Sequence, residues 1–97
     1  MALSRDEILG APDMEPVAED VPEWGGEVLI RRFTAGEALK MEDASGIDIM
    51  AAALVDEDGV GLFTTDDVRA LEGKSAVAVN RVLQRVLKVN GLSSEGN

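Results

Sequence analysis

The sequence contains no cysteine, no histidine and no tyrosine. Without cysteine it cannot form disulfides, iron–sulfur clusters, thiolate zinc sites or a cysteine nucleophile. Without histidine it lacks the commonest general base, the commonest metal ligand and the usual proton shuttle. The groups left for chemistry are carboxylates, hydroxyls, lysines and arginines. We therefore expect a protein that is not an enzyme and that uses no cofactor and no metal.

Aromatic residues are nearly absent as well: the chain has only Trp24, Phe33 and Phe63, so its core must be mostly aliphatic. A length of 97 residues, with 45% hydrophobic residues, suits one modest core and argues against disorder of the whole chain. We expect a single small α+β domain over residues 1–92. Within it, residues 10–23 form a partly extended acidic segment, and residues 93–97 form a flexible tail.

Long apolar runs are also missing. The longest, Ile49–Val55, has seven residues, far short of the ~20 that span a bilayer. The first residues show no basic stretch followed by an apolar one, so we expect no signal peptide and a cytoplasmic location. The net charge of −10 repels nucleic acid and anionic membranes at long range. We therefore expect that the chain binds neither membranes nor nucleic acid.

Turn and capping residues predict the elements. Two glycines, Gly25 and Gly26, predict a tight two-residue turn in a β-hairpin over residues 17–33. Capping boxes at Ser4–Glu7 and Thr34–Glu37 begin helices through about Leu9 and Asp43. Later elements are a helix or a buried strand at 47–55, a short strand at 60–63, a helix at 66–72 capped by Thr64 or Thr65, and a helix from the Ser75 cap to about Asn90. The predicted fold is an N-terminal β-hairpin packed with about four short-to-medium helices, followed by an amphipathic C-terminal helix.

The last helix carries the most information, because its apolar residues fall within an arc of about 160°. Some step by three and four, as in a coiled-coil seam. The stripe either packs on the protein's own hairpin and helices or faces a partner, including another copy of the chain. Trp24 is likewise either a packing anchor of the hairpin or a contact residue. The candidate partner-binding residues are Val79, Val82, Leu83, Val86, Leu87, Val89 and Trp24.

Two other patterns are weaker. The turn Asp56–Gly59 has acids as in a calcium loop, but aligning Gly59 with the loop glycine places Leu54 and Thr65 at ligand positions. The last two helices could form a helix-turn-helix with Arg81, Arg85 and Lys88 on one face. Residues 68–97 carry a local charge of +3, from two acids and five bases. The acidic whole argues against DNA, so a small DNA-binding regulator is a minor alternative.

The order of motifs resembles one known family. The chain opens with Ser4–Leu9, continues with Val21–Val28, then Leu54–Gly59 and Leu62–Thr64, and closes with Asp67–Val68, Lys74–Ala76 and Asn90–Leu92. This series, over nearly the whole chain, is similar to the tail assembly chaperones of long, non-contractile-tailed phages and prophages. The segment between Thr34 and Ile49 is shorter than the family's usual helical stretch.

The resemblance implies a non-enzymatic role. Such chaperones bind the long, apolar, helical tape-measure protein and keep it soluble until tail-tube subunits polymerise around it. The implied partners are the tape-measure protein, the tail-tube protein and further copies of the chain. The implied location is the host cytoplasm, with the protein absent from the mature virion. The alternative is a structural tail or connector protein of the particle.

Overall fold

The computed structural model describes residues 2–64 and 66–92, and within them it has an α+β fold, as predicted. A three-stranded antiparallel sheet is formed by β1 (Val17–Val21), β2 (Gly26–Ile30) and β3 (Leu54–Val55), in that order. β1 and β2 are the predicted hairpin, whose register pairs Val17 with Ile30 and Val21 with Gly26. β3 pairs with the end of β2 through Leu29–Val55 and Ile30–Leu54.

The predicted two-residue turn at Gly25-Gly26 is wrong, because the hairpin loop lies earlier. Pro22–Trp24 forms a 3₁₀ turn (η1) and Gly25 ends it with a φ of +80°. The Gly25 N–H donates to the carbonyls of Val21 and Pro22, both at 3.1 Å. Proline has no N–H and a fixed φ, which suits the first position of such a turn. Gly26 is therefore already the first residue of β2.

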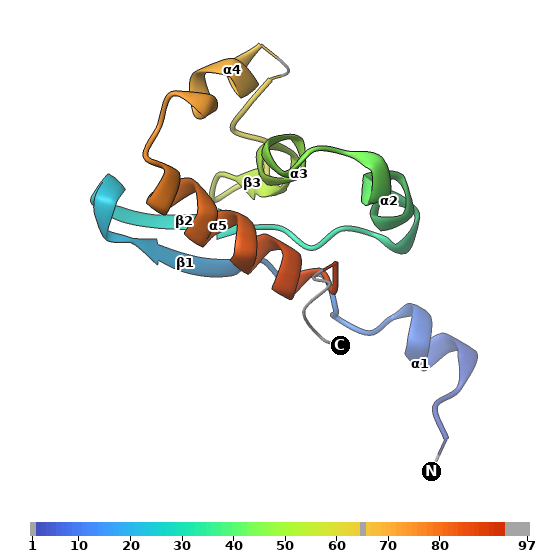
Figure 1. The fold of residues 1–97 in the computed structure, drawn as a ribbon. Coiled ribbons are helices and arrows are strands. Elements are labelled where there is room, and N and C mark those ends of the chain that lie inside the picture. The colour runs from blue at the N-terminus through green and yellow to red at the C-terminus, as the bar shows by residue number, and fades with distance from the viewer. Residues whose placement is uncertain (1, 65, 93–97) are drawn as a thin grey trace.

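The helices are α1 (Arg5–Leu9), α2 (Ala35–Lys40) with a 3₁₀ extension η2 (Met41–Asp43), α3 (Gly46–Ala53), α4 (Asp67–Glu72) and α5 (Ala76–Val89). Figure 1 shows α5 lying across the hairpin, with α3 beside it and α2 and α4 further out. Helix α1 lies apart from this body at the end of an extended segment.

Both predicted capping boxes are confirmed. In α1 the Ser4 hydroxyl accepts the Glu7 N–H at 3.2 Å, and the Glu7 carboxylate accepts the Ser4 N–H at 2.8 Å. In α2 the same pair of bonds joins Thr34 and Glu37. These bonds satisfy backbone donors that a helix leaves free at its first turn.

The predicted cap of α4 is wrong for Thr64. Asp66 occupies the cap position, and no side-chain capping bond forms there. Thr64 instead donates its N–H and its hydroxyl to the Asp67 carboxylate, at 2.9 and 3.2 Å. The other predicted cap residue, Thr65, lies outside the described residues.

Residues 47–55 are a helix that ends in a strand. α3 stops at Ala53, whose carbonyl accepts the Arg31 N–H at 2.8 Å, and Leu54–Val55 then join the sheet. The predicted short strand at 60–63 is not formed as such, since Gly61 makes an isolated bridge to Val55 and its neighbours are irregular.

The core lies between α3, α5 and the inner face of the sheet. Its largest fully buried side chains are Val21, Ile30, Met50, Leu54, Val82 and Val86. No polar residue is buried in the described part of the chain. Residues 2–16 are exposed throughout, and the predicted tail at 93–97 lies outside the described residues. Among the described helices none is long and apolar enough to traverse a bilayer.

Candidate partner-binding surface

Helix α5 is the element that carries most of the predicted contact residues. Its first turn is capped by Ser75, whose hydroxyl accepts the Ala78 N–H at 3.3 Å. At the other end Gly91 has a φ of +67°, and the Leu92 N–H reaches back to the Leu87 carbonyl at 2.8 Å. A glycine in this left-handed conformation is the usual way to end a helix. These caps fix where α5 begins and ends.

Two of the seven predicted contact residues are not at the surface. Val82 and Val86 have no exposed area, and with Ala78 they form the centre of the helix face that packs on β1 and α3. This corrects the sequence-based assignment for these two residues. The centre of the apolar stripe on α5 is buried in the protein's own core. Only the residues at the edges of the stripe can contact another molecule.

The other five candidates are half-buried. Val79, Leu83 and Leu87 lie along one flank of the buried stripe, and Val89 continues the stripe itself at the end of α5. Trp24 lies at the hairpin loop. The structure therefore aligns Val79, Leu83 and Leu87 and places Val89 and Trp24 elsewhere.

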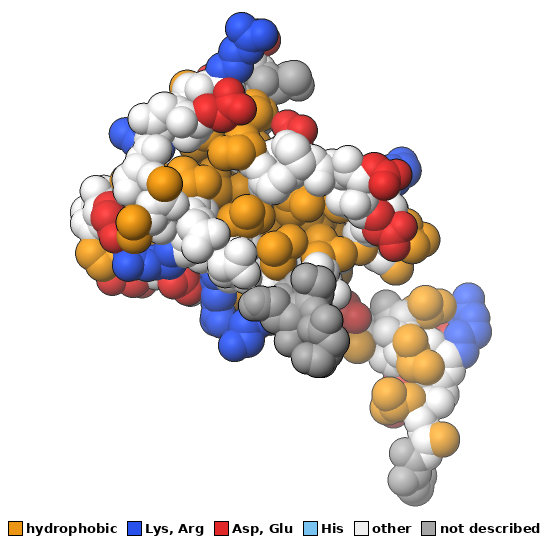
Figure 2. All heavy atoms as spheres, in the orientation of Figure 1, with side chains coloured by type: hydrophobic (Ala, Val, Ile, Leu, Met, Phe, Trp, Pro, Cys, Tyr) orange, Lys and Arg blue, Asp and Glu red, His pale blue; other side chains and the backbone are white. Residues whose placement is uncertain are grey.

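An apolar groove runs between α3, α4 and α5. Its volume is about 300 Å³, and its apolar lining comes from Ile47, Leu71, Ala76, Val79 and Leu83. Figure 2 shows hydrophobic side chains gathered over this part of the molecule. At one wall α3 approaches α5 so closely that a Cβ on Gly46 would lie 2.8 Å from Leu83 Cδ2. The groove is thus a packed, shaped surface.

The basic side of α5 is turned toward the acidic hairpin. Arg81 Nη1 donates to Glu23 Oε1 at 2.5 Å, and Arg85 Nε lies 3.3 Å from Glu19 Oε1. The DNA-binding alternative requires Arg81, Arg85 and Lys88, and the two arginines are engaged in these ion pairs. Half-exposed pairs of this kind contribute little to stability, but they leave these arginines less available to phosphates.

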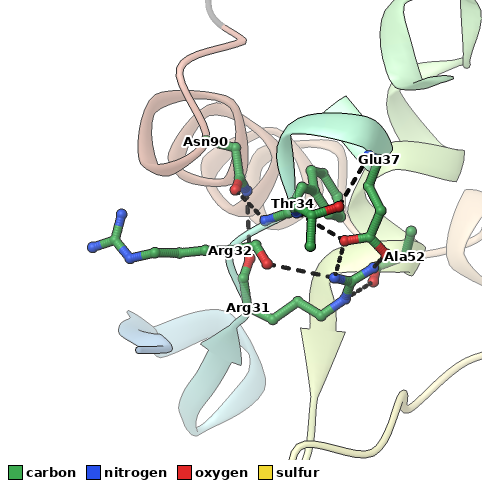
Figure 3. Close-up of polar contacts among 7 residues, drawn as sticks. Arg31, Arg32, Thr34, Glu37, Ala52 and Asn90 are labelled. Atoms are coloured by element: carbon green, nitrogen blue, oxygen red, sulfur yellow. Dashed lines mark hydrogen bonds and ion pairs between the residues drawn. The ribbon is translucent and has the colours of Figure 1, made fainter. Parts of the chain in front are cut away.

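A network around Arg31 holds the end of β2 against α2 and α3 (Figure 3). The guanidinium donates to both carboxylate oxygens of Glu37, at 2.9 and 3.0 Å, and to the Ala52 carbonyl at 3.0 Å. The Arg31 hydrogen bonds, together with the Thr34 N–H, lower the pKa of Glu37 from 4.5 to about 2. One carboxylate therefore caps α2 and also joins it to the sheet.

Asn90 is a second joining residue that the sequence reasoning missed. Its Oδ1 accepts the Phe33 N–H at 2.7 Å, and its Nδ2 donates to the carbonyls of Val86 and Arg31 at 3.1 and 3.4 Å. The side chain thus fixes the end of α5 to the chain leaving β2, as Figure 3 shows. The available signal was an asparagine just before the helix-ending glycine.

Trp24 lines a second open cavity of about 340 Å³, between the hairpin loop and α4, which shares Leu71 with the groove. The cavity is mainly apolar, with Leu62, Phe63, Ala70 and Leu71 around the indole. The indole Nε1 is buried and has no hydrogen-bond acceptor in the described part of the chain. Trp24 therefore belongs both to the hairpin's packing and to an open apolar surface.

The acidic turn after β3 uses its carboxylate internally. Asp56 Oδ1 accepts the N–H groups of Asp58 and Val60, at 2.8 and 3.0 Å. This is an Asx-type turn, in which the side chain stabilises the loop. Within residues 2–64 and 66–92 no group of three acidic side chains is arranged to hold a metal ion.

The fold of this chain is similar to that of a solved structure. No protein-family model matches the sequence, and no curated protein matches it either. The structure of the bacteriophage HK97 tail assembly chaperone superposes with a TM-score of 0.57 at 19% sequence identity. The match covers 87% of this chain and 94% of the other. The chain has a tail assembly chaperone-like fold. At this identity the likeness concerns the fold alone.

Proposed function

We propose that this chain is a phage tail assembly chaperone. It binds the tape-measure protein, keeps it soluble and recruits tail-tube subunits while the tail is built. The supporting observation is the likeness of fold to the HK97 chaperone over most of both chains. In this proposal the protein acts without catalysis in the host cytoplasm and is absent from the mature virion.

The physical properties of the chain suit this role. A long helical protein with exposed apolar stripes aggregates by itself. The half-buried flanks of α5 and the adjoining groove offer an apolar surface that accepts a helix. The net charge of −10 then keeps the coated complex dispersed. We assign the tape-measure contact to Val79, Leu83 and Leu87, which lie along one flank of α5.

Co-expression tests the proposal. The tape-measure protein encoded in the same genome is produced with and without this chain, and its soluble fraction is measured. We expect it to be soluble with the chain and to co-purify with it. Asn80→Arg, at an exposed residue lining the groove, should reduce both results. Gln84→Arg, also exposed and on the same helix but outside the groove lining, is the matched control.

Three outcomes contradict the proposal. The tape-measure protein could stay insoluble when the wild-type chain is present. Mass spectrometry of purified particles could find the chain in stoichiometric amounts, which would make it a structural tail protein. A gel shift could show salt-dependent duplex binding, which would favour the DNA-binding alternative.

A further inference from the structure

The N-terminal arm (residues 2–16) presents an apolar face that meets nothing in the described part of its own chain. Leu3, Ile8 and Leu9 are 67%, 56% and 68% exposed. The capping box of Ser4 and Glu7 places Leu3 just before the helix and Ile8 at its fourth position. Side chains at these two positions form a hydrophobic staple and lie on the same side of the chain. The arm therefore carries a small, shaped apolar knob.

Helix α1 needs a surface to pack on. It has five residues, and isolated helices shorter than about 12 residues are marginal in water, because nucleation is costly. Its capping bonds are exposed to solvent. Burial of the knob against another apolar surface is the contribution that would hold the helix in place.

The Trp24 cavity offers such a surface. Its walls are apolar, and Leu62 at its edge is 46% exposed. A volume of about 340 Å³ is typical of pockets that bury a few apolar groups. Tryptophan is also among the residues enriched where binding energy concentrates at protein interfaces.

In a single molecule, the N-terminal arm and the Trp24 cavity lie at opposite ends of the hairpin. The arm leaves the sheet at the start of β1, where Arg32 Nε holds the Glu15 carbonyl at 3.0 Å. The hairpin loop with Trp24 lies beyond the other end of β1 (Figure 1). To return, residues 9–15, which span at most about 25 Å, would have to leave their present path and run back along β1. They would also lose the turn bonds at Ala11 and Asp13.

We propose that the α1 knob of one copy docks in the Trp24 cavity of a second copy. Arm and cavity lie at opposite ends of a molecule 49 Å long, so the contact joins different chains. The inference does not depend on the proposed function, because the contact requires only this chain.

Sedimentation velocity of the purified chain tests the proposal. We expect wild type to form a dimer or larger species whose fraction rises with concentration. Leu3→Ser with Ile8→Ser should shift it to monomer, and so should Ala70→Glu, which places a charge at the cavity. The matched controls are Leu39→Ser, at a leucine that is 69% exposed on α2, and Ala35→Glu, at an exposed alanine at the start of α2. All of these residues are exposed, so the fold should survive.

Disulfide trapping locates the contact, since the chain has no cysteine of its own. Mixed Ile8→Cys and Ala70→Cys proteins should cross-link, whereas Leu39→Cys and Ala70→Cys proteins should not. A wild-type chain that is monomeric at every concentration would overturn the proposal. So would an arm variant that stays oligomeric, or a double Ile8→Cys/Ala70→Cys chain that closes its disulfide internally. None of these results bears on tape-measure solubility, so the two proposals fail separately.

Discussion

Asn90→Ala tests whether one side chain fixes the end of α5 to the end of the hairpin. Asn90 is the acceptor for the Phe33 N–H and donates to the carbonyls of Val86 and Arg31. Alanine keeps the helix-ending backbone but removes all three bonds. The free energy of unfolding should fall, and the loss should come mainly from one buried donor.

The magnitude follows from burial. Phe33 is 8% exposed, and an N–H that loses its acceptor away from water costs about 1–3 kcal/mol. The Nδ2 bonds, of 3.1 and 3.4 Å, add roughly 1 kcal/mol together. We therefore expect a loss of about 2–4 kcal/mol. Domains of this size have a stability of about 5–15 kcal/mol, so the variant should still fold.

Urea unfolding, followed by the fluorescence of the single tryptophan, measures this loss. With a slope of about 1–3 kcal/mol per molar urea, the midpoint should fall by about 0.7 M or more. Asn80→Ala is the control, because Asn80 is exposed on the same helix and makes one long contact with Gln84 at 3.5 Å. It should change stability by no more than about 0.5 kcal/mol. If the two variants lose the same stability, the joining role of Asn90 is refuted.

Two further predictions concern charge. Glu37→Gln keeps the capping geometry but removes the ion pair with Arg31. The full pKa shift of Glu37 would correspond to roughly 3 kcal/mol of folding stability. Because the carboxylate is 38% exposed, solvent screening reduces the expected loss of stability to about 1 kcal/mol. Because the pKa of Glu37 is lowered in the folded state, the wild type should be more stable than the variant above pH 4.5, and this difference should disappear as the pH falls toward about 2. Urea unfolding at pH 7 and at pH 2.5 measures the difference. If it is the same at both pH values, the prediction is wrong. Val82→Asp puts a charge into a fully buried position and should unfold the chain, by more than about 4 kcal/mol. Val77→Asp is the control, because Val77 is 64% exposed on the same helix, and it should leave the far-ultraviolet circular dichroism unchanged. If the two variants give equal spectra, α5 does not face the core through Val82.

The elements that depend on local chemistry were predictable from the sequence. The capping boxes at Ser4 and Thr34 and the Ser75 cap act within one helical turn, so a few neighbouring residues determine them. The hairpin was also found from its turn residues and from the alternation before and after them. Its loop was misplaced, because Pro22 can begin a turn as well as Gly25 can end one.

Tertiary pairing decided what the sequence left open. The run Ile49–Val55 is apolar on every side, so its period distinguishes neither helix nor strand. Its last residues join the sheet because the edge of β2 is there to receive them. In the same way, the pattern of α5 identified an apolar face but not which part of it faces the core. That choice depends on β1 and α3, which contact Val82 and Val86.

The remaining candidate-site features depend on contacts between residues far apart in the chain. Asn90 meets Phe33, and Arg81 meets Glu23, across intervals of 57 and 58 residues. The Trp24 cavity likewise combines the hairpin loop with α4. No local pattern encodes such meetings, so the polar joints and the cavity emerge only in three dimensions.

Gly46 determines the width of the groove without lining it. Any side chain there must displace the end of Leu83, which is flexible enough to swing outward. Substitution at this one position would therefore reshape the binding surface while its chemical character stays the same.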